Sequence, residues 1–395
     1  MKRNVLYDYS YRNNKADYLL SLTASIQPAL SIMQLFLVDA LHYGAEEANI
    51  IRVLSTAIPI LASMFIVLRR KPILTLTTYF IVGCLLLSGI MVPGRWAFMK
   101  SDVLKFTIPV VVPIGLCIAS VKNFPVLVKS MEVMSIIAAV IGILYGAMYL
   151  SGRILLDNYS MAFSYSILFP TIILIARKKI VWKFLAILLM IEMLAIGSRG
   201  ALLLSITFWL FTIVWKNLSL IKCIVWTICI YVGYKLLFHP VISIVADIFD
   251  SFGVNSRTLR LLLDNELIEH DSGRNVLYQH TWELINQNPF FGNGVWADRQ
   301  HLGIYCHNIF LELLLDYGYI GTFVILSVII LFQLRIFTKI PKNHKFIYVL
   351  MFGIVCPLFV SSSYLISYNL GMFLGFSYLL SNLYKKRSYQ EFTLE

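Results

Sequence analysis

The chain has 395 residues, of which 59% are hydrophobic and only 14% are charged. Soluble globular proteins carry roughly a quarter charged residues, so this composition excludes a single soluble core. The formal net charge of +12 is compatible with a nucleic-acid partner, but the basic residues form short clusters between apolar runs. Membrane topology accounts for such clusters, so no nucleic-acid partner is expected. The composition predicts a polytopic helical membrane protein.

About twelve apolar runs of a length that suits membrane-spanning helices follow one another along the chain. They lie near residues 19–41, 48–68, 73–92, 103–121, 131–150, 159–176, 181–197, 201–215, 219–238, 309–334, 346–364 and 368–384. The first run lacks a small-residue cleavage site, which predicts a retained helix rather than a signal peptide. The sequence shows no internal repeat and no soluble segment, so residues 1–395 are expected to form one all-α integral membrane domain.

Short basic connectors follow every second predicted span. They contain Arg69, Arg70 and Lys71; Lys122 and Lys129; Arg177, Lys178 and Lys179; Lys216 and Lys222; Arg335, Lys339, Lys342 and Lys345; and Lys385, Lys386 and Arg387. Positively charged connectors stay in the cytoplasm, so both termini are expected to be cytoplasmic. Residues 239–306 then form a large extracytoplasmic loop between two transmembrane helices.

This predicted loop contains four arginines and no lysine between His239 and His307. The arginines are Arg257, Arg260, Arg274 and Arg299. A guanidinium is a planar, permanently charged fork that binds phosphate through two parallel hydrogen bonds, whereas lysine is a point charge. The arginines therefore indicate a phosphate-bearing ligand, and solvation or contact with anionic lipid headgroups is the ordinary alternative.

Ser198-Arg199-Gly200 joins two apolar runs with almost no connector, which predicts a tight hairpin or a broken helix. Arg199 is then held near the outer bilayer surface, where an arginine extends to headgroups more often than it binds a substrate. Glu192 precedes it by about two helical turns and is expected on the same face. A carboxylate within a span needs a partner, so structural pairing is the expected role of Glu192, with catalysis as the alternative.

The segment from Ser272 to Gly321 is the longest polar stretch away from the ends of the chain. Arg274 begins a predicted helix, and Asn288-Pro289 and Gly292-Asn293-Gly294 mark tight turns. His307-Asn308 then opens another predicted helix, on which Glu312 and Asp316 are spaced to pair with arginines or to hold the helix in place.

A histidine exchanges protons near neutral pH, so His307 suits the role of general base, with a hydrogen-bonded interfacial residue as the alternative. The other loop histidines, His239, His270, His280 and His301, have no spacing that favours a metal, and no metal or cofactor is expected.

These motifs together resemble the O-antigen polymerase and ligase superfamily. The matching pieces are Ser198 to Gly200, Arg274, the N-P-x-x-G-x-G turn from Asn288 to Gly294, and the segment from His307 to Gly321. The motifs cover about a quarter of the chain, and each is degenerate. Their order, spacing and predicted side of the membrane are together more specific than any one of them.

The resemblance implies a metal-independent, GT-C-like membrane glycosyltransferase. It implies that Arg199 and Arg274 hold the pyrophosphate of an undecaprenyl-pyrophosphate-linked glycan, and that His307 takes the proton from the acceptor hydroxyl. Further candidates for substrate binding are Arg257, Arg260, Arg299, Asn308 and Trp282. The expected setting is the outer face of the cytoplasmic (inner) membrane, with a lipid-linked acceptor, a chain-length regulator and a flippase as partners.

Two other functions remain open at this stage. A ligase would transfer the glycan to lipid A-core with the same donor and similar residues; the motif from His307 to Gly318 and the absence of an added C-terminal domain favour a polymerase of O-antigen or capsular polysaccharide. A flippase of lipid-linked oligosaccharide belongs to a different class. Transporters commonly show internal repeats and polar sites at mid-membrane, whereas the polar residues of this chain concentrate in one outer loop.

Overall fold

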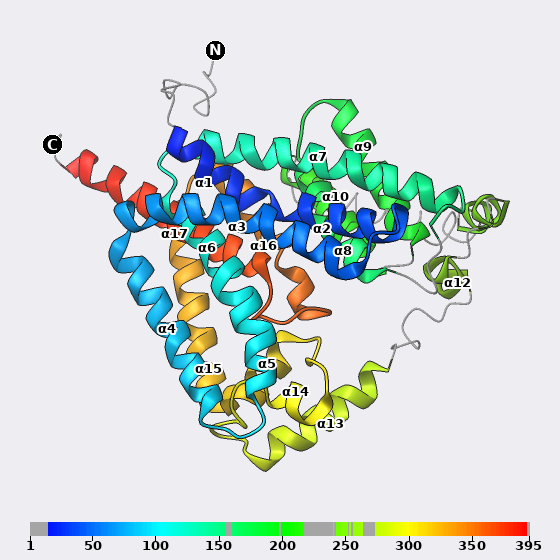
Figure 1. Ribbon diagram of the computed structural model, residues 1–395. Helices are drawn as coiled ribbons and strands as arrows, with labels where there is room; N and C mark the ends of the chain where they lie inside the picture. Colours follow the sequence, from blue (N-terminus) through cyan, green and yellow to red (C-terminus); the bar gives the residue numbers. More distant parts are fainter. Residues whose placement is uncertain are drawn as a thin grey trace. The chain divides into compact units, whose positions relative to one another are not determined.

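The computed structural model describes residues 15–154, 160–196, 199–216, 240, 242–251, 253, 256–263 and 273–392. Within these ranges the regular structure is helical throughout (Figure 1). The chain divides into two compact units. Unit 1 comprises Met1–Gln27, Ser55–Met131 and Gly273–Glu395, and unit 2 comprises Pro28–Leu54 and Glu132–Ser272. The expected outer loop of residues 239–306 contributes to both units, and the prediction of a single membrane domain stays a prediction.

The first half of the chain forms α1 (Lys15–Ser25), α2 (Gln27–Leu35), η1 (Phe36–Ala40), α3 (Ala45–Arg70), α4 (Pro72–Ile90), α5 (Trp96–Met99), η2 (Lys100–Val111), α6 (Val112–Ser120), α7 (Phe124–Leu150), α8 (Met161–Ile175), α9 (Ile180–Ala195) and α10 (Arg199–Lys216). The second half forms α12 (Arg257–Leu263), α13 (Arg274–Gln287), α14 (Ala297–Leu302), α15 (Ile309–Lys339), α16 (Lys342–Gly353), η3 (Cys356–Phe359) and α17 (Tyr368–Phe392).

The expectation of about twelve spans is wrong. In the part of the chain that the structure describes, four helices are long and apolar enough to cross a membrane, namely Ala45–Arg70, Trp96–Ser120, Phe124–Leu150 and Ile309–Lys339. A fifth is added if the bent pair Lys15–Ser25 and Gln27–Ala40 forms one span. The run at 219–238 lies outside the described residues. These candidate spans still indicate a multi-pass membrane protein.

Breaks in the helices explain why the count from hydropathy was too high. The predicted span at 346–364 contains α16, which has 12 residues, and then the short η3 around Pro357. A helix of that length rises about 18 Å, well short of the roughly 30 Å of a bilayer core. Hydropathy alone records an apolar run and not whether its backbone stays helical.

A buried carboxylate joins several helix ends of unit 1. The Asp17 side chain is fully buried and forms an ion pair with Arg70. Arg70 also donates to the carbonyl of Ser120 at 2.9 Å, and the backbone N–H of Asn123 donates to Asp17 at 2.9 Å. The start of α1, the end of α3 and the end of α6 therefore meet here, next to two of the basic connectors.

The polar segment that begins at Gly273 lies at the other end of unit 1. Helix α4 starts at Pro72, beside the Arg70 anchor, and ends at Ile90, so its 19 residues separate the two ends by about 28 Å. The end of α4 approaches the polar segment, since Gly89 faces the ring of Trp296. Figure 1 shows α13 and α14 at this end, away from α1 and the C-terminal part of α17. Within unit 1, the polar segment is therefore opposite the basic connectors.

Glycines allow α6 and α17 to approach each other closely. A Cβ atom added to Gly375 would lie 2.2 Å from the carbonyl oxygen of Gly115, and one added to Gly371 would lie 2.4 Å from that of Val111. Gly371 and Gly375 form a G-x-x-x-G pair, the spacing that places two small residues on one helix face in membrane proteins. This contact fixes α17 against the centre of unit 1.

Unit 2 is built around α7, α8, α9 and α10. The ring of Tyr145 stacks on Phe163 with centroids 4.4 Å apart, and its hydroxyl donates to Asp39 at 2.7 Å. Glu192 of α9 is buried against α7, where Gly146 leaves space for its carboxyl group. Glu192 forms no ion pair within the described part of the chain, so the structure shows no partner there for the pairing role expected of it.

We predict that Gly375→Ala destabilises the protein, because its Cβ would overlap the backbone of α6 and force the two helices apart. Overpacking of this kind costs about 1–3 kcal/mol. A lower melting temperature of the detergent-purified protein would be the measured result. Gly83→Ala is the matched control, since a Cβ at Gly83 meets no atom within 4 Å. Equal melting temperatures for the two variants would contradict the close approach of α6 and α17.

Candidate functional site

The N-P-F-F-G-N-G turn forms backbone hydrogen bonds with the middle of α15. The N–H of Asn293 donates to the carbonyl of Leu315 at 2.7 Å, and the N–H of Tyr319 donates to the carbonyl of Pro289 at 2.7 Å. Helix α15 is interrupted between these bonds at Gly318, whose φ of 63° lies in the left-handed region. The backbones approach so closely that a Cβ on Gly292 would lie 2.5 Å from the nitrogen of Gly318. The turn is therefore fixed to α15 through its backbone, although Phe290 and Phe291 remain exposed at the surface.

Arg95, in the short connector after α4, holds the other side of this turn. Its side chain is buried and donates to the carbonyls of Asn293 at 2.6 Å and Val295 at 2.9 Å, and to the side chain of Gln300 at 2.7 Å. Sequence reasoning missed Arg95, although an arginine directly after Pro93-Gly94 in an otherwise apolar connector was a usable signal. Its role is to fix the polar segment to α4.

A cluster of charged residues lies beneath this turn, centred on Arg299 of α14. Its Nη1 donates to Asp298 at 2.6 Å and to Glu312 at 2.7 Å. Its Nε donates to Asp102 at 3.1 Å and its Nη2 to the hydroxyl of Ser363 at 2.6 Å. Four of the five guanidinium donors are thus used inside the protein. Burial alone would lower the pKa of Arg299, but the carboxylates of Asp298 and Glu312 raise it above the ordinary value of arginine.

The carboxylates of α15 also contact the segment that precedes α17. Tyr364 donates its hydroxyl hydrogen to Asp316 at 2.7 Å, and its backbone N–H donates to Glu312 at 3.3 Å. The spacing of Glu312 and Asp316 by four residues places both on one helix face. The expected pairing of Glu312 with an arginine is confirmed, and its partner is Arg299.

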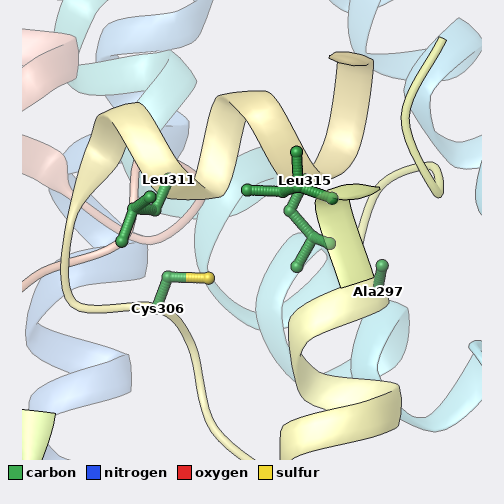
Figure 2. Close-up of a cluster of buried hydrophobic side chains, with 5 residues drawn as sticks. Ala297, Cys306, Leu311 and Leu315 are labelled. Carbon is green, nitrogen blue, oxygen red and sulfur yellow. The ribbon is translucent and has the colours of Figure 1, made fainter. Parts of the chain in front are cut away.

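A buried apolar cluster brings together the helices on either side of Cys306. It contains Ile285 of α13, Ala297 of α14, Cys306, and Leu311 and Leu315 of α15. Figure 2 shows Leu311 and Leu315 on the helix that follows Cys306, with Ala297 close by. The cluster holds the chain around residue 306 against α13 and α14, so His307 follows directly from a buried residue.

His307 lies two residues before the start of α15 and has an uncommon backbone conformation. Its φ is 55°, and its ring lies 4.3 Å from that of Tyr305, centroid to centroid. The side chain is half-buried, and its Nδ1 is buried without a hydrogen-bond partner among the described residues. Asn308 is the N-cap of α15, with its side-chain oxygen accepting from Phe310 at 2.9 Å and Leu311 at 3.4 Å. Non-glycine residues with positive φ concentrate at functional sites.

Arg274, the first residue of α13, lies close enough to His307 for their charges to interact. Burial lowers the pKa of His307 below its ordinary value, and the positive charge of Arg274 lowers it further. The backbone of Ser361 acts in the opposite direction through a hydrogen bond, and Arg299 adds to the lowering. The half-buried Arg274 makes no hydrogen bond or ion pair with any residue in the described ranges. A guanidinium available for an anion thus stands near an imidazole whose neutral form is favoured.

The structure brings Arg274, Arg299, Asn308 and His307 together within unit 1. Trp282 is exposed on α13, with 41% of its surface accessible. The remaining candidates, Arg199, Arg257 and Arg260, belong to unit 2. Arg199 starts α10, Arg260 is exposed on α12, and the side chain of Arg257 lies outside the described part of the structure. A joint site that includes Arg199 stays a prediction.

Neither a known protein family, nor a curated protein, nor a solved structure matches this chain. Within the residues that the structure describes, no group of three or more histidine, cysteine or acidic side chains is placed to hold a metal ion.

We expect Arg274→Gln to raise the pKa of His307, because removing a neighbouring positive charge makes the imidazolium form less unfavourable. In the unaltered protein His307 should titrate below about 6.5, the value of an unperturbed histidine. The pH dependence of the His307 signal in histidine-labelled protein measures this by NMR. Arg335→Gln is the control, since Arg335 is exposed in the last turns of α15 and its loss should leave the titration unchanged. An unchanged pKa in Arg274→Gln would show that the two side chains do not interact.

Proposed function

We propose that this protein is a membrane glycosyltransferase that joins lipid-linked oligosaccharide repeat units into O-antigen or capsular polysaccharide. The observation that carries the proposal is the pair formed by Arg274 and His307. Arg274 offers a guanidinium without a partner among the described residues. His307 offers an imidazole whose pKa is lowered by burial and by the charge of Arg274. A phosphate-binding group next to a base is what transfer from a pyrophosphate carrier needs.

The position of the pair in unit 1 supports a substrate that resides in the membrane. Arg274 and His307 belong to the polar segment at the end of α4 away from Arg70 and its basic connector. Basic connectors remain on the cytoplasmic side, so we assign the pair to the extracytoplasmic face of the cytoplasmic membrane. The polar headgroup of a polyprenyl carrier would reach the pair there, with its chain in the bilayer.

The proposed reaction is a single displacement. The acceptor hydroxyl oxygen bonds to the anomeric carbon of the donor as the bond from that carbon to the pyrophosphate oxygen breaks, and the pyrophosphate leaves with the electron pair. Arg274 stabilises the negative charge that develops on the leaving group. His307 accepts the hydroxyl proton as the general base. Inversion at the anomeric carbon follows from a single displacement.

A ligase that passes the glycan to lipid A-core would use the same donor and the same two residues. Deletion of the gene followed by analysis of the surface glycan separates the two functions. A single repeat unit on lipid A-core, or its equivalent in a capsule, indicates a lost polymerase. Polymer retained on the polyprenyl carrier indicates a lost ligase, and loss of outward-facing carrier-linked units would contradict both and indicate a flippase.

Replacement of the proposed base should stop the transfer. We predict that His307→Ala abolishes long glycan chains while the protein remains at normal levels in the membrane. General-base catalysis contributes about 10²- to 10⁴-fold, so residual polymer should fall below detection on a polysaccharide gel. His301→Ala is the control, because His301 is exposed and lies in the same segment. Long chains in the His307→Ala strain would refute the assignment of the base.

Replacement of the proposed phosphate-binding group should weaken donor binding. Arg274→Lys keeps the charge but loses the two-pronged hydrogen bonding of the guanidinium. We expect the KM for a lipid-linked donor to rise about tenfold or more, which corresponds to about 1.4 kcal/mol of lost binding. The measurement is transfer in isolated membranes over a range of donor concentrations, with Arg335→Lys as the control. An unchanged KM would mean that Arg274 does not bind the donor.

A further inference from the structure

A single nitrogen atom of Arg299 binds the chain on both sides of His307. On the N-terminal side, Nη1 donates to Oδ2 of Asp298 at 2.6 Å, and that same oxygen accepts the backbone N–H of Cys306 at 3.3 Å. On the C-terminal side, Nη1 donates to Oε1 of Glu312, in the first turn of α15, at 2.7 Å. The residue before His307 and the helix that begins after it are therefore both tied to one guanidinium.

The backbone conformation of His307 is unfavourable and must be stabilised by contacts of the neighbouring residues. A residue with a Cβ in the left-handed region costs on the order of 1–3 kcal/mol and persists only where its surroundings hold it there. His307 has a φ of 55°, while Cys306 on one side is buried and Asn308 on the other caps α15. Without the contacts of Arg299 with Asp298 and Glu312, residues 306–308 would be free to relax to a more common backbone conformation. The imidazole of His307 would then change its orientation.

Arg299 also supports the ring of His307 through a neighbouring aromatic side chain. Its guanidinium carbon lies 5.5 Å from the ring centroid of Tyr305, within the range of a cation–π interaction. The ring of Tyr305 in turn lies 4.3 Å from that of His307. The imidazole is thus fixed through its backbone and through its ring, and both routes lead to Arg299.

We propose that Arg299 is a positioning residue that orients His307, rather than a residue that binds the substrate. Its side chain is 7% exposed, and four of its five donors are taken by Asp298, Glu312, Asp102 and Ser363. These contacts leave little of the guanidinium for a ligand. The inference rests on the proposed function for the role of His307, but the geometric claim about His307 does not depend on it.

Arg299→Lys tests the proposal because it keeps the positive charge and removes the fork. A lysine ammonium cannot bind Asp298, Glu312, Asp102 and Ser363 in the planar arrangement that the guanidinium provides. We expect turnover of the lipid-linked donor to fall about 10- to 100-fold, since a small displacement of a catalytic group has effects of this size. The KM for the donor should stay within about twofold, because Arg274 is unchanged.

A second readout follows His307 without any assay of activity. In the unaltered protein, burial lowers the pKa of His307, and the charged side chains that act on it are Arg274 and Arg299. Because Arg299→Lys preserves the charge, a rise in this pKa toward 6.5 would report that the ring has become more exposed to water. The titration is measured by NMR on histidine-labelled protein, with Arg335→Lys as the control.

The combined results separate the possible failures. A raised KM with normal turnover and an unchanged His307 titration would overturn the proposal, since Arg299 would then bind the donor directly. Unchanged turnover and titration would overturn it as well. A shifted titration in a protein that transfers no glycan in its unaltered form would support the positioning role and refute the proposed function.

Glu312→Gln provides a second variant in case Arg299→Lys does not fold. It keeps the shape of the side chain and weakens the anchor on the C-terminal side of His307, together with the contacts from Ser363 and Tyr364. A smaller loss of turnover than in Arg299→Lys is expected, with the KM for the donor within about twofold. Unchanged turnover in folded Glu312→Gln protein would overturn the proposal.

Discussion

The buried guanidinium of Arg299 is the constraint on which the polar end of unit 1 depends. It joins three separate parts of the chain, through Asp102 before α6, Glu312 in α15 and Ser363 before α17. Removing one partner of a buried ion pair costs about 3–5 kcal/mol because an unpaired charge remains. Loops and helix ends from three parts of the chain are therefore held together, and the chain on both sides of His307 is attached to them.

Close approaches at glycine residues add to the contacts of the charged cluster in holding unit 1 together. The left-handed Gly318 interrupts α15 where the turn before Trp296 must hydrogen-bond to it, and Gly89 leaves room on α4 for the buried indole of Trp296. At the centre of unit 1, Gly115 and Gly375 let α6 and α17 meet. Small residues at these positions therefore permit the close packing around the charged cluster and at the centre of unit 1.

Sequence reasoning selected Arg274 and His307, and the structure places them within electrostatic reach of each other. It did not separate them from Arg299 or Asn308, whose side chains are engaged within the protein as the centre of an ion-pair cluster and as a helix cap. It missed Arg95, whose place after Pro93-Gly94 indicates a role but does not identify the distant carbonyl groups that it binds. The count of membrane helices was too high, since hydropathy cannot show that the apolar run at 346–364 is divided between the end of α16 and the short η3.

The sequence by itself determined that the protein is an all-helical membrane protein with a polar, arginine-containing segment before the helix that starts after His307. These properties depend on composition and on local periodicity, which each stretch of chain carries alone. Tertiary structure decided which arginine is available for a ligand and which is buried. That distinction depends on partners that lie far apart in the chain, such as Asp102 and Ser363 around Arg299. Only their packing in space determines whether a guanidinium meets carboxylates of its own protein or remains open to a phosphate.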